Sequence, residues 1–81
     1  MYIRFSNNIH NISNYQSVIK SEKGNYIHLT KNEDYVALVL KDSDAVDFVL
    51  SKIWAELEKN TSFLDIDKEL ELFYSTNKYN L

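Results

Sequence analysis

The chain has 81 residues, a formal net charge of −3 and no cysteine, and 44% of its residues are hydrophobic. Its length implies one domain with one small core, its apolar content argues against disorder, and its longest apolar run is too short to cross a bilayer. Because a secreted domain this small usually carries disulfides and no signal-peptide pattern opens the chain, we expect a cytoplasmic protein.

Residues 1–41 predict a meander of short antiparallel strands, because alternating or continuous apolar residues are separated by polar turn residues. The predicted strands are residues 1–5, 9–12, 15–20, 25–30 and 35–40. The only glycine, Gly24, lies in the polar stretch Ser21 to Asn25, where we expect it to supply the left-handed residue of a hairpin loop. The run from Tyr35 to Leu40 is apolar throughout and predicts a buried strand.

Residues 42–59 predict one long amphipathic helix. Its apolar residues recur at helical intervals, at Ala45, Val46, Val49, Leu50, Ile53, Trp54 and Leu57. Asp42 or Ser43 can cap the helix by accepting hydrogen bonds from its first free amides. We therefore expect the helix to cover one face of the sheet, with Trp54 packed against the strands.

The segment 63–74 fits two structures. As a helix, it places Phe63, Ile66, Leu70 and Phe73 on one stripe, and its composition favours this alternative; as a strand, it alternates acidic and apolar residues. Residues 75–81 form a polar tail that we expect to be frayed. The predicted fold is a single α+β domain over residues 1–81, with an antiparallel sheet of four to five strands, one long helix on one face and a short carboxyl-terminal helix.

The sequence nominates no catalytic, metal or cofactor site. His10 and His28 lie on separate predicted strands, without a patterned serine or acid beside them. Asp65 and Asp67 form an Asp-x-Asp pair, but no glycine-rich phosphate loop accompanies them. We therefore predict a protein that is not an enzyme and that uses no cofactor.

The charge is divided unevenly along the chain. Residues 1–41 carry five basic and three acidic residues, whereas residues 42–81 carry four basic and nine acidic ones. If the tail were extended, Asp65, Asp67, Glu69 and Glu71 would project from one side about 6.6 Å apart, close to the phosphate spacing of a nucleic-acid backbone. This pattern raises the hypothesis of an inhibitor that mimics nucleic acid in a basic groove.

Aromatic and basic residues in the first half raise a second hypothesis, weak binding of nucleic acid. The residues that would form this surface are Tyr2, Arg4, Tyr26, His28 and Tyr35. Tyrosines on a sheet face can stack on bases, but tyrosine is also common in strands for its propensity alone. Since the chain is acidic overall, we expect protein rather than nucleic acid to be the partner, and no membrane contact.

Some apolar residues lie off the predicted core faces and are candidates for contact with a partner. These are Phe48, beside the stripe of the long helix, and Leu72 and Tyr74 in the tail, together with the tail acids Asp65, Asp67, Glu69 and Glu71. In so small a chain, association would also add stability.

The opening Met1 to Phe5, the polar hairpins and the strand that leads into a helix containing Ile53 and Trp54 resemble small uncharacterised bacterial proteins of the same length. The resemblance covers residues 1–66 and implies no function. A small acidic α+β chain is also similar in size and charge to phage-encoded inhibitors of host defence. We therefore expect a non-enzymatic interaction or regulatory module of bacterial or phage origin, with a second copy among the candidate partners.

Overall fold

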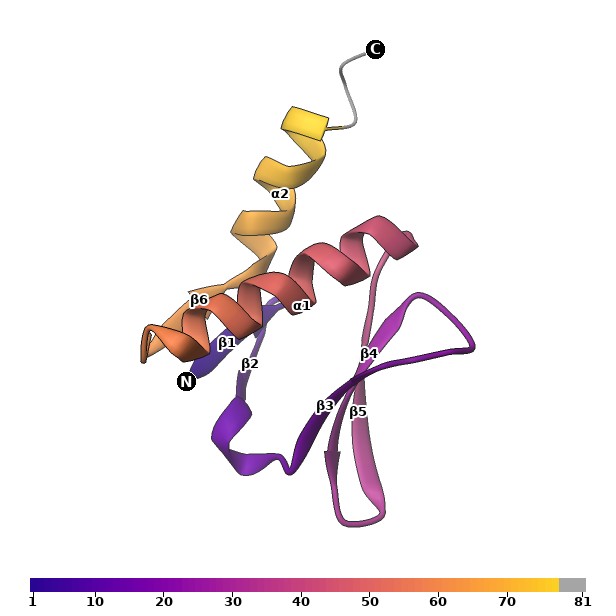
Figure 1. Cartoon of the computed structure of the whole chain (residues 1–81), viewed down its shortest axis with the longest axis vertical. Helices are drawn as coiled ribbons and strands as arrows, with labels where there is room; N and C mark the ends of the chain where they lie inside the picture. Colours follow the sequence, from indigo (N-terminus) through magenta and orange to yellow (C-terminus); the bar gives the residue numbers. More distant parts are fainter. Residues whose placement is uncertain (78–81) are drawn as a thin grey trace.

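The computed structural model describes residues 1–77, which form two three-stranded sheets and two α-helices (Figure 1). In chain order the elements are β1 (Tyr2–Phe5), β2 (Asn8–Asn11), the 3-10 turn η1 (Ile12–Asn14), β3 (Ser17–Lys20), β4 (Tyr26–Lys31), β5 (Asp34–Val39), α1 (Ser43–Glu58), β6 (Phe63–Asp65) and α2 (Ile66–Asn77). The sheets have the strand orders β2-β1-β6 and β3-β4-β5. The predicted α+β class is confirmed.

The expected single antiparallel sheet is wrong, because the strands divide into two sheets and one strand comes from the tail. β1 pairs antiparallel with β2 on one side and parallel with β6 on the other. The parallel register sets Ile3 beside Leu64, and both side chains are buried in the core. This pairing brings residues 2–4 beside residues 63–65, which gives β1 a hydrogen-bonded neighbour on each side.

The sheet β3-β4-β5 is the antiparallel meander that the sequence predicted. A two-residue turn joins β4 to β5, and its first residue, Asn32, has a φ of 57°, as such hairpin turns require. The prediction for Gly24 is wrong in its reason, because its φ is not positive. A Cβ at this position would instead collide with the ring of Tyr26, so any larger residue here would require that ring to move.

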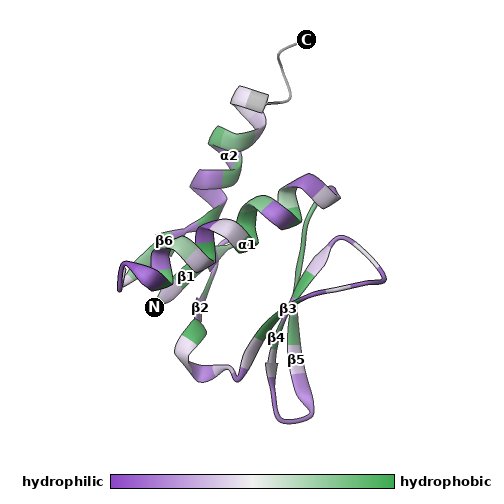
Figure 2. Ribbon diagram, in the orientation of Figure 1, coloured by the Kyte–Doolittle hydropathy of each residue, from purple (hydrophilic) through white to green (hydrophobic). Residues whose placement is uncertain are grey.

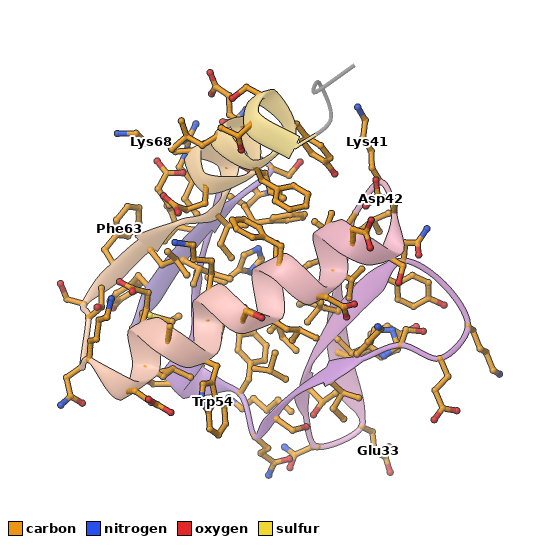
Figure 3. The ribbon with its side chains drawn as sticks, turned by 45° about the horizontal axis from the view of Figure 1, so that its top comes forward. Glu33, Lys41, Asp42, Trp54, Phe63 and Lys68 are labelled. Carbon is orange, nitrogen blue, oxygen red and sulfur yellow. The ribbon has the colours of Figure 1, made fainter. Side chains whose placement is uncertain are left out.

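The helix α1 begins where the sequence predicted. The Asp42 side chain accepts a hydrogen bond from the Ala45 amide at 2.8 Å, and in Figure 1 α1 passes in front of β1, with the β3-β4-β5 sheet below it. The prediction that Trp54 belongs to the core is wrong, since this residue is 68% exposed and its side chain projects away from the helix in Figure 3. The apolar stripe is wider than the surface that the sheets cover, so its flank remains in solvent.

The segment 63–74 combines the two predicted alternatives. Phe63–Asp65 is strand β6, and the helix α2 follows at once. Asp65 ends the strand and caps the helix, because its Oδ1 accepts a hydrogen bond from the Lys68 amide at 3.1 Å. Residues 75–77 continue α2, so the expected frayed tail is wrong there; its remainder, residues 78–81, lies outside the described residues.

One cluster of apolar side chains joins both sheets to the helices. Its buried members are Ile3, Phe5, Ile12, Ile27, Leu29, Leu38, Leu40, Ala45, Val46, Val49, Ile53, Leu64 and Ile66. Among the described residues no polar or charged residue is buried, and Figure 2 shows the β4–β5 hairpin ending in a hydrophilic tip. Neither α1 nor α2 is long and apolar enough to span a membrane, and no other helix in residues 1–77 is.

Candidate functional site

The first two acids of the tail hold the β1–β2 turn in place. Asp65 accepts hydrogen bonds of 3.0 and 2.9 Å from Arg4 Nη1, and Asp67 lies 3.6 Å from Arg4 Nε. Asp67 also accepts hydrogen bonds from the amides of Ser6 and Asn7, at 2.7 and 3.0 Å. Both turn residues have positive φ. These two carboxylates therefore stabilise a strained turn and are not free for a partner.

The four tail acids do not form an extended row, because Asp67, Glu69 and Glu71 lie in the helix α2 and only Asp65 lies on a strand. Glu69 makes an ion pair with Lys52 at 2.9 Å, and Glu71 is exposed. The pKa of Asp65 is lowered, chiefly by the Lys68 amide and further by Arg4. The geometry on which the mimicry hypothesis depends is therefore wrong for this chain.

Two of the three apolar partner candidates are used within the molecule. The ring of Phe48 stacks on Phe73 with centroids 4.4 Å apart, which attaches α2 to α1. Tyr74 packs edge-on against Phe73, and Lys41 Nζ lies 5.0 Å from its ring centroid. Burial, followed by the nearby Asp42 charge, raises the pKa of Tyr74. Of this trio only Leu72 has an exposed side chain.

The residues of the nucleic-acid hypothesis are divided between the two sheets. Tyr2 and Arg4 lie on β1, whereas Tyr26, His28 and Tyr35 form a row of contacting rings on β4 and β5, with centroids 5.0 and 4.5 Å apart. His10 lies on β2, in the other sheet from His28. Within residues 1–77 no group of histidine and acidic side chains is placed to hold a metal ion.

The ring row lies on a sheet face that carries no charged side chain. Cross-strand partners share a face of a sheet, and the registers of β3, β4 and β5 define this one. We call it the outer face; its members are Ser17, Ile19, Tyr26, His28, Thr30, Tyr35, Ala37 and Val39. Tyr35 and Val39 are 61% and 67% exposed. An exposed apolar face of this kind is typical of a contact surface.

The outer face ends at β5, whose far edge is open. Leu40 N donates to Asn25 O at 2.8 Å, and hydrogen-bonded pairs alternate along an antiparallel ladder. The amides and carbonyls of Tyr35, Ala37 and Val39 therefore point away from β4. No residue in the described part of the chain forms a backbone hydrogen bond with them on that side. A hollow lies between this edge and the β1–β2 hairpin, and it is lined by Phe5, Ser6, Asn8, His10 and residues 36–39.

Sequence reasoning placed Tyr35 among the tyrosines of a possible nucleic-acid surface, but it missed this edge, because it interpreted Tyr35 to Leu40 as a buried strand. The structure covers only the face that bears Val36 and Leu38. A signal was available in the sequence. The alternate positions Tyr35, Ala37 and Val39 carry no charged residue, and a chain of this length is too small to cover both faces of a sheet. In a small protein, such a run indicates an exposed contact surface as readily as a buried strand.

A second exposed apolar region lies on the flank of α1. The indole of Trp54 and the side chain of Leu57 border a shallow groove, whose other lining residues are Val18, Leu50 and Ile53. Trp54 is the only tryptophan in the chain. The helical spacing identified these residues, but it could not say which part of the stripe the sheets would leave uncovered.

Comparisons of the chain with protein-family models, curated proteins and solved structures gave no match.

Proposed function

We propose that the protein is a non-enzymatic interaction or regulatory module of the cytoplasm, which binds a β-strand of a partner protein along the open edge of β5. The observation that supports this proposal is the combination of unpaired backbone groups at Tyr35, Ala37 and Val39 with an uncharged, exposed face beside them. An edge strand with these properties is a template for a further strand. Backbone hydrogen bonds supply affinity in such complexes, and alternate side chains supply specificity.

The outer face suits a protein partner better than a nucleic acid. Its row of rings could stack on bases, but a nucleic-acid surface also needs cations that follow the phosphate backbone. None of the members of the outer face is lysine or arginine. Arg4, the basic residue of the original hypothesis, is engaged by Asp65 and Asp67.

A lysine on the edge provides the test, because natural proteins protect open edges with charged side chains. We expect the full-length Ala37→Lys variant to lose association with its partner, whether the partner is another protein or a second copy. Ile9→Lys is the matched control, since Ile9 is an exposed apolar residue on β2, an edge of the other sheet.

Affinity capture with quantitative mass spectrometry, together with light scattering for self-association, measures the effect. The proposal requires an association that the wild type and Ile9→Lys share and that Ala37→Lys lacks. Equal binding by all three chains would show that β5 is not the contact, and the absence of association by every chain would remove the proposal altogether.

A further inference from the structure

We infer that the strand bound at this edge is β5 of a second copy of the chain, paired antiparallel about a two-fold axis at Ala37. This inference rests on the proposed function and adds the identity of the partner and the register. The two-fold axis sets Ala37 opposite the partner's Ala37 and Tyr35 opposite the partner's Val39. The two three-stranded sheets then form one continuous six-stranded antiparallel sheet.

The register satisfies the unpaired backbone groups of both copies. In the hydrogen-bonded pairs of an antiparallel ladder, each residue donates one bond and accepts one. Tyr35, Ala37 and Val39 are the β5 residues whose groups face the open side, and this register pairs all three with outward-facing residues of the other copy. If the register were shifted by two residues, one of these three residues in each copy would lose its hydrogen-bonding partner. If it were shifted by one residue, backbone groups that face the open edge would lie opposite groups that already point toward β4.

The side chains of the outer face are complementary in the same register. Tyr35 and Val39, both largely exposed in the single chain, would lie across from each other twice in the dimer. Aromatic and β-branched residues form favourable cross-strand pairs. The small side chain of Ala37 lies at the axis, where each strand meets its own copy. The ring row of each sheet would continue through this contact into the second sheet.

Charge favours a second copy over an unrelated strand. Glu33 and Lys41 flank β5 and lie at its opposite ends in Figure 3. Neither makes an ion pair with another residue of the described chain, and the Lys41 ammonium, which lies 5.0 Å from the Tyr74 ring centroid in the single chain, would turn from that ring to meet Glu33. Antiparallel pairing about Ala37 brings Glu33 opposite the partner's Lys41, and the symmetry repeats this pair at the other end. An opposite charge at each end of the strand is the pattern that two-fold pairing requires.

The other edge of the same sheet offers less to a second copy. Ser21 N donates to Tyr26 O, so the alternation of the ladder leaves Val18 and Lys20 as the outward-facing residues of β3. The Lys20 ammonium already pairs with Asp47 at 2.7 Å. The β3 edge therefore presents two residues rather than three and lacks a matching charge at its ends.

Single cysteines test the register directly, because the natural chain contains none. Hydrogen-bonded antiparallel partners have Cα atoms about 5.5 Å apart, but their Cβ atoms lie farther apart than a disulfide prefers, so a short bismaleimide is the suitable cross-linker. We expect full-length Ala37→Cys to form a covalent dimer with this reagent. Tyr35→Cys and Val39→Cys should each remain monomeric in the denaturing assay, and a mixture of the two should form a cross-linked heterodimer that mass spectrometry identifies.

Charge reversal tests the same register without a cross-link. Glu33→Lys and Lys41→Glu should each weaken dimerisation roughly tenfold in light scattering or analytical ultracentrifugation, because two attractive pairs become repulsive. Their equimolar mixture, and the double variant, should restore it. Circular dichroism of each variant confirms that the fold is unchanged.

The outcomes separate this inference from the proposed function. A covalent Ala37→Cys dimer and rescue by the mixed charge variants would support it. If light scattering showed a dimer that neither cross-links at Ala37 nor responds to charge reversal, the inference would be overturned. The proposed function as an interaction module would still stand. A chain that is monomeric at every concentration would also overturn it, and the capture experiment with Ala37→Lys would then decide whether another protein binds the edge.

Discussion

The parallel pairing of β6 with β1 gives the sharpest stability prediction, because it separates the two structures that the sequence allowed for residues 63–74. In a helix beginning at Phe63, Leu64 would lie off the apolar stripe, and Leu64→Ala would change stability by less than about 0.5 kcal/mol. In the structure Leu64 is only 6% exposed and lies beside Ile3. We therefore expect Leu64→Ala to be strongly destabilising.

The size of the effect follows from burial. Leu→Ala removes three carbon atoms, each worth about 0.8 kcal/mol of transfer free energy, and the remaining cavity raises the total into the range of roughly 2–5 kcal/mol. A value near 3 kcal/mol would be a large share of the stability expected for a domain of this size, about 4–12 kcal/mol at 0.05–0.15 kcal/mol per residue. It corresponds to a fall in Tm of roughly 12–24 °C.

Urea unfolding followed by far-ultraviolet circular dichroism measures the change. Leu72→Ala is the matched control, since it makes the same substitution at an exposed position of α2, and it should cost less than about 1 kcal/mol. A double-mutant cycle of Leu64→Ala with Ile3→Val should show coupling of about 0.5 kcal/mol or more. If Leu64→Ala proved as mild as Leu72→Ala, the strand β6 and its pairing with β1 would be wrong.

Three further predictions concern local features. Asp42→Ala should lower the free energy of unfolding by about 0.5–2 kcal/mol, because the first turn of α1 loses its cap; an unchanged urea midpoint would contradict this role. The folded-state pKa of Asp65 is lowered. Its carboxylate therefore stabilises the fold fully at a pH above the ordinary pKa of aspartate, and this contribution disappears as the pH falls through the folded-state pKa. Asp65→Asn should therefore show a smaller loss of Tm between pH 5 and acid than the wild type, and parallel curves would refute the argument. Gly24→Ala should destabilise the hairpin by collision with the Tyr26 ring, and it should be tolerated in a Tyr26→Ala background; equal costs in both backgrounds would show that the ring is not the obstacle.

The sequence by itself determined the elements whose signals are local. The cap at Asp42 and the helical spacing after it fixed the start of α1, because both act within one turn of the helix. Likewise, the alternation and short polar turns of residues 17–39 fixed the meander of β3, β4 and β5. These features depend on neighbours in the chain, so one sequence is enough to read them.

Only the tertiary structure decided which apolar surfaces are covered. The pairing of Ile3 with Leu64 joins two residues that are far apart in the sequence, and no local pattern specifies so distant a parallel neighbour. This pairing directs β6 and α2, so it also determines that Phe48 meets Phe73. Trp54 and Tyr35 belong to apolar segments that the sequence predicted to be buried. Both are exposed, because two small sheets and two helices cannot cover every apolar face. Burial depends on the whole arrangement of elements, and for this reason the open edge of β5 became visible only in three dimensions.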